Sequence, residues 1–534
     1  MGAFALSMER RSMKEYLVTA QEMKRYDANT IGEFGMPGLV LMERAALCTV
    51  EELQRVCGSI PCRVLVAAGC GNNGGDGLAV GRLLLLAGYE VTFVMPGDGG
   101  RCTEETGRQI TVLERYGAHI FSTMQDGEYD IVVDALFGVG LSRDVAGIWR
   151  EAVAWINRSS AFVCSVDIPS GIDADTGRVL GCAVEADLTV TYGFRKVGQL
   201  LYPGAACCGT LVCRQMGIDE RSFLHREPCW YTYGREEKGL LPVRPADGNK
   251  GTFGKALLIA GSEKIGGAAM MAAKSTFRAG AGMVKVVTAR ENRTALQQFV
   301  PEAMLLTYPR EGEAEAGFLA DLEEAERWAD CILIGPGIGT GERAHELLRF
   351  ALLKSALPLV IDADGINLLA GDGKLQSAMA DREGPERTII LTPHPGEFAG
   401  IFGGTVREAK EGLLRHPGEL AERLHCVVVC KDARTVVVQP GGGHRYLNTT
   451  GNCGMATAGS GDVLAGMITG LLAQGMAGME AAVTGVYLHG CAGDLAAALK
   501  TETAMTATDL LDCIAEAVRL HDRAAARNTE VTIC

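Results

Sequence analysis

Residues 63–77 read RVLVAAGCGNNGGDG and join an apolar, β-rich run to a glycine-rich turn. The pattern predicts a buried strand over 63–68 and a helix over 78–87. A turn of this kind presents bare backbone N–H groups and the positive end of the helix dipole, which suit a pyrophosphate. It is neither a G-x-G-x-x-G fingerprint nor a P-loop. The alternative interpretation is a tight turn closed by an Asn side chain.

Further apolar runs follow at regular intervals in the first half of the chain. They predict strands at 91–95, 130–134, 161–167, 188–192 and 210–213. Helical patterns at 19–46 and 103–116 precede and separate them. This alternation predicts a mostly parallel sheet with helices on both faces, a Rossmann-like doubly wound domain of the α/β class.

A second series of the same kind begins after residue 249. It predicts strands at 255–260, 283–287, 331–334, 358–362, 388–391 and 426–430, and a helical region at 462–527. Mixed charge and prolines between 219 and 249 place a boundary near residue 230. We therefore expect two α/β domains, at 17–225 and 235–527.

Composition narrows the class of protein. A chain of 534 residues exceeds what one hydrophobic core usually supports, and a net charge of −14 argues against a nucleic-acid binder. Eighteen cysteines without a C-x-x-C pair indicate small buried hydrophobes in a reducing compartment. The N-terminal MGAFALSMERR is the reverse of a secretory signal, and the longest uncharged stretch, 463–479, is too weak for a membrane span. We expect a cytoplasmic protein.

Two further strands of the first series end in polar, glycine-rich loops. Asp134 lies in VVDALFGVGLSRD, and Asp167 and Ser170 lie in SVDIPSGID. The carboxyl ends of neighbouring parallel strands form one crevice. Oxygen atoms of Asn73, Asp134 and Ser170 should therefore converge, and they suit a hard cation. Asp167 and Asp144 supply carboxylates for proton transfer.

In this order, GNNGGDG, DALFGVGLSRD and DIPSGIDADTG resemble the N-terminal domain of the NAD(P)H-hydrate epimerase family. The resemblance implies interconversion of the R and S forms of the C6-hydrated nicotinamide ring, with K⁺ held by Asn73, Asp134 and Ser170, and we expect Asp167 to be catalytic. The implied substrate contacts are Asn72, Asn73, Gly74, Gly75, Asp76, Gly138, Val139, Gly140, Leu141, Ser142, Arg143, Asp144 and Asp167. Alternatively, this half serves only in binding or oligomerisation.

Four loops of the second series carry chemistry. GPGIG, residues 335–339, could cradle a phosphate or a ribose, whereas DADG, residues 362–365, reads equally well as a helix cap. In TPHPGE, residues 392–397, a histidine between two prolines is conformationally fixed and suits ligand contact. A solvated loop histidine is the alternative. A Gly/Ala-rich helix from Gly266 suits either a ligand or close helix packing.

The sharpest motif is NCGMATAGSGD, residues 452–462, which leads into an apolar helix. Backbone N–H groups of Ala458 to Gly461 would form an anion hole for a transferring phosphoryl group. Asp462 would then accept a hydroxyl proton from the attacking substrate. The alternative is that Asp462 only complements the helix dipole.

NKGTFG, GPGIG, DADG, TPHPGE, KDART and NTTGNCGMATAGSGDVLAG together resemble the ribokinase-like superfamily, and within it the ADP-dependent NAD(P)H-hydrate dehydratases. The resemblance implies an α/β/α domain that phosphorylates the ring hydroxyl from ADP and then eliminates phosphate, giving NAD(P)H, AMP and phosphate, with Mg²⁺ offsetting phosphate charge. It implies substrate contacts from Ala268, Gly337, His394 and Asp462, with Asp462 catalytic. It implies nucleotide contacts from Lys431, Asp432, Ala433, Arg434, Thr435 and Gly461.

Three residues depart from the pattern of that family: Asn249 instead of His, Cys453 instead of Pro or Ala, and Ala458 instead of Gly. Ala458 bears most on rate, because a Cβ in the anion loop constrains φ. Since both halves would act on the same hydrated NADH or NADPH, we predict one enzyme that repairs both epimers. A homo-oligomer is expected. The chief alternative is a ribokinase-like small-molecule kinase with a non-catalytic N-terminal ligand-binding module.

Overall fold

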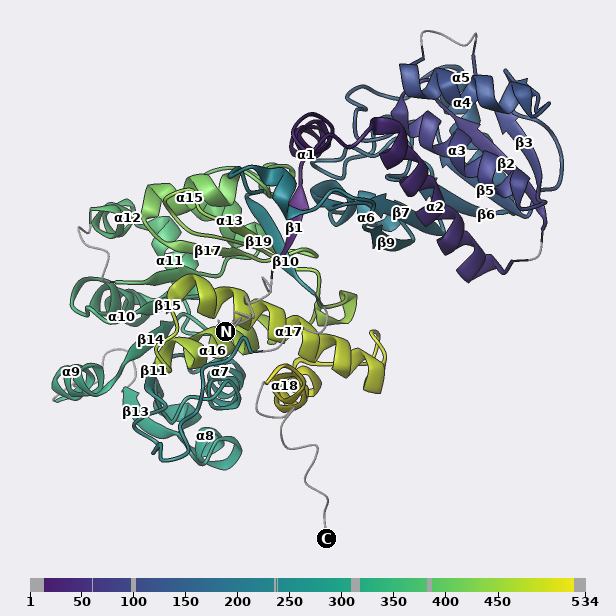
Figure 1. The fold of residues 1–534 in the computed structure, drawn as a ribbon. Coiled ribbons are helices and arrows are strands. Elements are labelled where there is room, and N and C mark those ends of the chain that lie inside the picture. The colour runs from purple at the N-terminus through teal and green to yellow at the C-terminus, as the bar shows by residue number, and fades with distance from the viewer. Residues whose placement is uncertain are drawn as a thin grey trace, which may run out of the picture. The chain divides into compact units, whose positions relative to one another are not determined.

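The structure is a computed structural model that describes residues 14–59, 61–97, 102–234, 237, 239–308, 317–381 and 387–522. These residues form two compact units (Figure 1). One is Tyr16–Trp230, and the other holds the described residues from Tyr231 onward with the two that precede Tyr16. The expected domain limits at 235 and 527, and the N-terminal segment read for a signal, lie outside the described residues.

The first unit is built on a parallel sheet. From edge to edge its strands are β4 (Ile120–Phe121), β3 (Glu90–Val94), β2 (Arg63–Ala68), β5 (Ile131–Ala135), β6 (Phe162–Val166), β7 (Leu188–Tyr192) and β9 (Thr210–Arg214). The chain runs outward from β2 to β4, returns to β5 beside β2, and continues to the other edge. The strand order therefore reverses between β2 and β5, which is where ligands bind in such sheets.

Helices cover both faces of this sheet. They are α1 (Ala20–Gly32), α2 (Gly38–Cys57), α3 (Asn72–Leu86), α4 (Glu104–Arg115), α5 (Ile148–Arg158) and the short α6 (Gly204–Cys207). Val64 and Val66 of β2 pack in one cluster with α2 and α3, whereas Leu65 and Ala67 pack in another with α5. This alternation follows from the two-residue period of a strand and confirms the doubly wound prediction.

The expected start of the helix after β2 at residue 78 is wrong, because α3 begins at Asn72. The glycine-rich run is thus the first turns of the helix. Glycine is needed there because α3 lies very close to the sheet: a Cβ on Gly77 would clash with Ala135, and one on Gly81 would clash with Phe93. Close packing outweighs the low helix propensity of glycine.

Outside this sheet, β1 (Lys14–Val18) pairs in parallel with the two-residue strand β8 (Arg195–Lys196), through Leu17 opposite Arg195 and Val18 opposite Lys196. Two short 3₁₀ turns follow, η1 (Val197–Gln199) and η2 (Glu220–Phe223). The sequence pattern did not predict β1 or β8.

The second unit has a mixed sheet. Its strands, in order, are β13 (Met304–Tyr308), β12 (Met283–Ala289), β11 (Lys255–Ile259), β14 (Cys331–Ile334), β15 (Leu359–Ile361), β16 (Ile389–Leu391), β17 (Val427–Cys430), β18 (Val436–Val438), β19 (Arg445–Leu447) and β10 (Trp230–Tyr233). Pairing is parallel as far as β17 and antiparallel from β17 to β19. The strand order reverses between β11 and β14. The six expected strands are confirmed, but β13, β18, β19 and β10 were not predicted.

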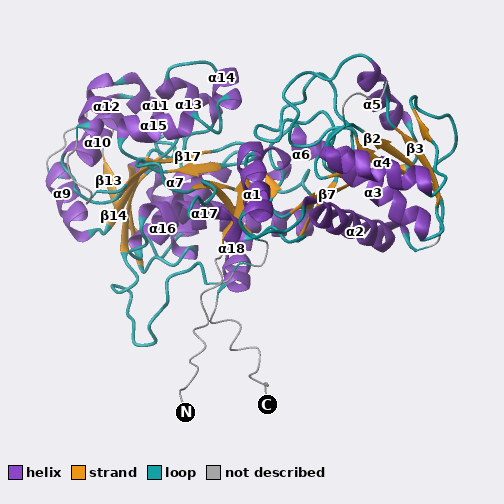
Figure 2. Ribbon diagram, turned by 45° about the horizontal axis from the view of Figure 1, so that its top comes forward, coloured by secondary structure: helices purple, strands orange, loops and turns teal. Residues whose placement is uncertain are grey.

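Helices again form two layers. On one side lie α10 (Glu342–Leu353), α11 (Asp364–Gly371), α12 (Gly373–Ala380), α13 (Pro395–Phe402), α14 (Val406–Glu411) and α15 (His416–Leu424); on the other lie α7 (Gly267–Arg278), α16 (Ser460–Ala473), α17 (Gly478–Lys500) and α18 (Ala507–His521) (Figure 2). The remaining helices are α8 (Arg293–Phe299) and α9 (Phe318–Trp328), and η3 (Arg290–Asn292) and η4 (Cys453–Met455) are 3₁₀ turns. This confirms the expected α/β/α arrangement.

Two helices, α7 and α16, pack so closely that no side chain fits on α16 at Gly466. A Cβ on Gly466 would clash with Ser275, and Thr276 Oγ1 donates to the Gly466 carbonyl at 3.0 Å. Every residue of α16 from Val463 to Ala473 is buried, which explains its almost wholly apolar sequence; the hydroxyl of Thr469 donates to the Ala465 carbonyl at 2.7 Å. Within the described part of the chain, no helix is long and apolar enough to cross a bilayer.

Candidate active site

A cavity of about 880 Å³ opens in the first unit at the carboxyl ends of β2, β5 and β6. Most of the residues proposed for this site line it: Asn72, Asn73, Asp76, Gly138, Val139, Gly140, Leu141, Ser142, Arg143 and Asp167. They come from the α3 N-terminus, the loop after β5 and the loop after β6. The structure thus brings together three loops that are about 30 to 90 residues apart in sequence, as expected at a reversal of strand order.

Three of the proposed substrate contacts are not among the residues that line the cavity. Gly74 and Gly75 are buried beneath it, where a Cβ would clash with the Gly69 carbonyl or approach Met42 Cε at 2.6 Å. Their role in the structure is to let α3 approach the preceding turn. Asp144 is exposed to solvent, so it lies apart from the carboxylates that face the cavity.

The three residues proposed as cation ligands meet around the Phe137 carbonyl. Asn73 Nδ2 donates to Phe137 O at 3.1 Å, and Ser170 Oγ lies 3.2 Å from the same oxygen. Ser170 Oγ also donates to Asp134 Oδ1 at 2.6 Å. The oxygen and nitrogen of an Asn amide exchange by a simple flip, so Asn73 can present either atom.

Asp134 is fully buried, and burial raises its pKa. Its donors among the described residues are all neutral: the Ser165 and Ser170 hydroxyls and the backbone N–H groups of Leu136 and Ser170. A buried carboxylate without a counter-charge is unfavourable. The carboxylate, hydroxyl and carbonyl oxygens gathered here therefore fit a hard cation.

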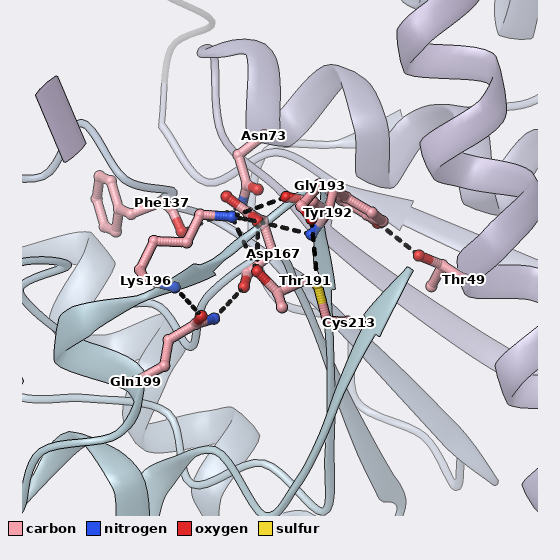
Figure 3. A network of polar contacts seen from close by, with 10 residues as sticks. All are labelled: Thr49, Asn73, Phe137, Asp167, Thr191, Tyr192, Gly193, Lys196, Gln199 and Cys213. Atoms are coloured by element: carbon pink, nitrogen blue, oxygen red, sulfur yellow. Dashed lines mark hydrogen bonds and ion pairs between the residues drawn. The ribbon is translucent and has the colours of Figure 1, made fainter. Parts of the chain in front are cut away.

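A second polar cluster in the same cavity centres on Asp167 (Figure 3). Lys196, only 1% exposed, forms an ion pair with Asp167 Oδ1 and donates to Thr191 Oγ1 at 2.8 Å. Gln199 Nε2 donates to the Asp167 carbonyl at 2.6 Å. Asp167 has a φ of +64°, a region that L-residues rarely adopt and that often marks functional positions.

Asp76 and Tyr192 complete the polar lining of this cavity. Burial and the neighbouring carboxylates Asp167 and Asp27 raise the pKa of Asp76 well above its ordinary value, although Lys196 opposes the shift. Tyr192 is buried, its hydroxyl lies 2.5 Å from Thr49 Oγ1, and burial raises its pKa. Lys196, Thr191, Tyr192 and Gln199 were not predicted, because they belong to no recognisable motif.

In the second unit, Asp362 joins three loops. It follows β15 and is 1% exposed; its Oδ1 accepts from Thr392 Oγ1 at 2.6 Å and from Lys431 Nζ at 2.9 Å. Two further hydrogen bonds connect the loop that follows β14. Asp364 Oδ2 accepts from Gly339 N at 2.8 Å, and Gly261 N, after β11, donates to Pro336 O at 2.8 Å. Three of the predicted loops, GPGIG, DADG and TPHPGE, are therefore linked to one another.

Asp462 faces this cluster from the first turn of α16. Burial raises its pKa to about 7, and Asp362 adds to the shift whereas Lys431 opposes it. Lys431 lies against Gly461, because a Cβ placed on Gly461 would be 3.3 Å from Lys431 Nζ. On α17, the buried ring of His489 lies 3.0 Å from the Ser460 carbonyl, and burial lowers its pKa to about 4. It therefore stays neutral at physiological pH.

His394 is fixed, as expected, but mainly because it caps a helix. Its Nδ1 accepts from Gly396 N at 3.0 Å, and Glu397 Oε2 accepts from His394 N at 2.8 Å, which forms a capping box at the start of α13. The ring is 56% exposed, and its Nε2 lies 3.3 Å from Glu397 Oε1. Glu397 is buried, and burial raises its pKa. Both ring nitrogens of His394 thus have a partner within this segment.

The other predicted positions are two implied substrate contacts and the implied nucleotide contacts at 431–435. Ala268 and Gly337 adjoin, since a Cβ on Gly337 would be 3.0 Å from that of Ala268. The run Lys431, Asp432, Ala433, Arg434 and Thr435 connects β17 to β18, and only Lys431 reaches Asp362. Among the described residues, no group of three or more His, Cys, Asp or Glu side chains could hold a metal ion.

The three departures are locally accommodated. Ala458 is exposed and is not one of the residues with positive φ, whereas its neighbour Gly459 takes +93°, so the Cβ at 458 imposes no strain. Asn249 Oδ1 accepts from Gly251 N at 2.9 Å and closes a turn. Cys453 Sγ donates to Glu502 Oε2 at 2.9 Å on the surface.

Comparison with known proteins finds two family matches. Residues 38–198 match the family described as YjeF-related protein N-terminus, and residues 256–516 match NAD(P)H-hydrate dehydratase. The bifunctional NAD(P)H-hydrate repair enzyme Nnr of Moorella thermoacetica is 36% identical over 94% of this chain and 97% of its own length. The enzymes of the same name from Thermofilum pendens and Escherichia coli K12 are 36% and 33% identical, over 93% and 84% of this chain and 95% and 84% of their own lengths.

Two solved structures resemble the second unit. An ADP/ATP-dependent NAD(P)H-hydrate dehydratase from Bacillus subtilis, co-crystallised with ATP and Mg²⁺, is 31% identical over 52% of this chain and 93% of its own, with a TM-score of 0.43. A ribokinase-like superfamily protein from Enterococcus faecalis is 27% identical over 55% and 98%, with a TM-score of 0.46. On the sequence matches, which extend over nearly the whole chain, this protein belongs to the family of bifunctional NAD(P)H-hydrate repair enzymes.

Proposed function

We propose that the protein repairs hydrated NADH and NADPH in two linked reactions. The first unit interconverts the R and S epimers of the hydrated ring, and the second dehydrates the S epimer with ADP, releasing AMP and phosphate. The observation that carries the proposal is Asp462, a carboxyl with a pKa of about 7 at the N-terminus of α16 and beside Lys431. A group that ionises near neutral pH at that place suits a base in phosphoryl transfer.

In the dehydratase, Asp462 takes the proton of the ring hydroxyl as its oxygen attacks the terminal phosphorus of ADP and AMP leaves. Backbone N–H groups between Ala458 and Gly461 stabilise the charge on the transferred group. Lys431 lies on the same side, so its ammonium offsets negative charge near Gly461. Loss of phosphate and of a neighbouring C–H proton then restores the dihydropyridine ring. Mg²⁺ would enter with the nucleotide and offset the phosphate charge, held mainly by phosphate oxygens.

In the epimerase, Asp167 moves a proton on the hydrated ring, which the cavity above α3 receives. Backbone N–H groups at the start of α3 and the loop Gly138–Asp144 would contact the dinucleotide. K⁺ would be held by Asn73, Asp134 and Ser170, where it supplies the positive charge that the buried Asp134 lacks. Coupling the two units lets one chain clear both epimers.

Separated epimers of hydrated NADH test this proposal through absorbance at 340 nm. With ADP and Mg²⁺, the S epimer should regain absorbance at once, and the R epimer should do so at a rate set by the first unit. The same assay with ATP decides the nucleotide. If absorbance does not recover with either nucleotide, while a vitamin or a sugar is phosphorylated, the protein is a kinase and the proposal fails.

A further inference from the structure

Lys196 is a buried cation in the first cavity to which the proposed reaction assigns no role. It ends β8 with 1% of its side chain exposed. Besides its ion pair with Asp167, its Nζ donates to Thr191 Oγ1 at 2.8 Å and to the Tyr192 carbonyl at 3.4 Å. Its side chain is thus held from three directions (Figure 3). An ammonium this deeply buried is unfavourable unless it is paired, so its position is tied to Asp167.

The hydrogen bonds that the Asp167 side chain accepts are all on one carboxylate oxygen. Oδ1 accepts from Lys196 Nζ, from Thr191 Oγ1 at 3.0 Å and from Tyr192 N at 3.4 Å. No described residue donates to Oδ2, and the side chain lines the cavity with 13% exposed. The anchoring of Oδ1 therefore leaves Oδ2 for a ligand.

Lys196 is also connected to the backbone of Asp167. Gln199 Oε1 accepts from Lys196 N at 2.7 Å, while Gln199 Nε2 donates to the Asp167 carbonyl at 2.6 Å. This bridge supports the left-handed conformation of Asp167. Side chain and backbone are therefore fixed by the same short segment, residues 195–199.

Asp76, a second carboxyl in the same cavity, differs from Asp167 in its contacts. No described residue forms a hydrogen bond or an ion pair with its carboxyl, and its pKa is raised well above the ordinary value by burial and by Asp167 and Asp27. The titratable groups that act on the two carboxyls are Lys196 on β8, Tyr192 on β7 and Asp27 on α1. The charged side chains of Lys24, Glu105 and Arg143 also line the cavity. Only Asp167 has a cation in direct contact.

We propose that Lys196 is the positioning residue of the first site: it holds Oδ1 of Asp167, turns Oδ2 to the cavity, and so makes Asp167, rather than Asp76, the carboxylate that acts on a ligand. This inference rests on the proposed epimerase function. An opposite charge in contact favours the ionised form of a carboxyl, whereas a carboxyl without one stays protonated more readily when buried. The pair therefore sets which of two neighbouring acids serves as the base.

The test uses the full-length chain and the R epimer, with S-epimer turnover in the same preparation as the control for the second unit. Lys196→Met should lower kcat for R-epimer repair by about 10²-fold or more at pH 7 and leave KM nearly unchanged. The fall in rate at acidic pH should move to higher pH by about one to three units, because the carboxylate loses its cation. Asp76→Asn should leave that acid limb in place.

The inference is overturned if the acid limb stays in place in Lys196→Met, or if Asp76→Asn moves it instead. Should Lys196→Met fail to fold, Lys196→Gln keeps a donor of similar length without the charge and should show the same displacement of the limb. The Asp167→Asn variant distinguishes failure of the proposed epimerase function from failure of the role of Lys196. If this variant repairs the R epimer as fast as the wild type, the proposed function fails; if it is inactive while Lys196→Gln behaves as wild type, only the role of Lys196 fails.

Discussion

Replacing Asp462 by asparagine should stabilise the second unit at pH 8 while it abolishes dehydration. Burial raises the pKa of Asp462 to about 7, and Asp362, Asp364 and Glu397 are carboxyl neighbours that add to or sustain the shift against Lys431. In the unfolded chain the same carboxyl has an ordinary pKa of about 3.9. The folded protein therefore bears an unfavourable charge at pH 8 that the asparagine variant lacks.

Proton linkage gives the sign and the size of this effect. Between the two pKa values the folded state binds more protons than the unfolded state, so the contribution of Asp462 to stability falls as the pH rises. With pKa values of about 7 and about 3.9, this contribution falls by about 2–3 kcal/mol between pH 5 and pH 8. Asparagine does not titrate. The advantage of Asp462→Asn over the wild type should therefore grow by about 2–3 kcal/mol over this range.

Urea unfolding of both proteins at pH 5 and pH 8 measures this difference, because groups common to the two proteins cancel. S-epimer turnover, measured on the same samples, should fall by about 10²-fold or more. A stability difference that is the same at both pH values, within about 0.5 kcal/mol, would show that Asp462 ionises normally in the folded protein. Near-wild-type turnover would restrict Asp462 to helix capping.

Three further predictions concern rates. In the wild type, kcat/KM for S-epimer dehydration should rise about tenfold from pH 6 to pH 8, since the ionised fraction of a base with a pKa of about 7 rises by that factor; a flat profile contradicts the assignment of Asp462. Asp167→Ala should abolish R-epimer repair and leave S-epimer repair intact, and unchanged R-epimer turnover would mean that the first site is not catalytic. Exchange of K⁺ for N-methylglucamine should slow only R-epimer repair, whereas equal slowing of both epimers would place the cation effect outside the Asp134 site.

The sequence predicted most strands and the loops at their carboxyl ends, because apolar β-rich runs and glycine-rich turns are local signals. It misjudged the start of α3, where packing against Ala135 and Phe93 overrides the helix propensity of glycine. The short strands β8, β18 and β19 were missed, since strands of two or three residues leave no periodic pattern. The cytoplasmic location, the homo-oligomer and the exact domain borders stay predictions.

The candidate sites show the same division between local and long-range information. The motifs located Asp167 and Asp462 at the sites because Asp167 directly follows a strand and Asp462 stands in the first turn of a helix. Lys196 was not found, since its position depends on pairing with β1, about 180 residues earlier. Asp362 was noted only as part of a motif, and its contact with Lys431 joins the ends of β15 and β17 across the intervening strand β16. Such contacts cannot be inferred from one sequence without its fold.

Both units contain an aspartate–lysine ion pair, but the pair acts differently in each unit. Each pairs an aspartate with a deeply placed lysine at the carboxyl edge of a parallel sheet: Asp167 with Lys196, and Asp362 with Lys431. Asp167 reaches the cavity, so its pairing orients the base itself. Asp362 is 1% exposed and cannot reach a ligand, so its charge acts on Asp462 and raises the pKa of that residue toward neutrality. Exposure of the paired aspartate, rather than the pairing alone, therefore decides which carboxyl moves the proton in each unit.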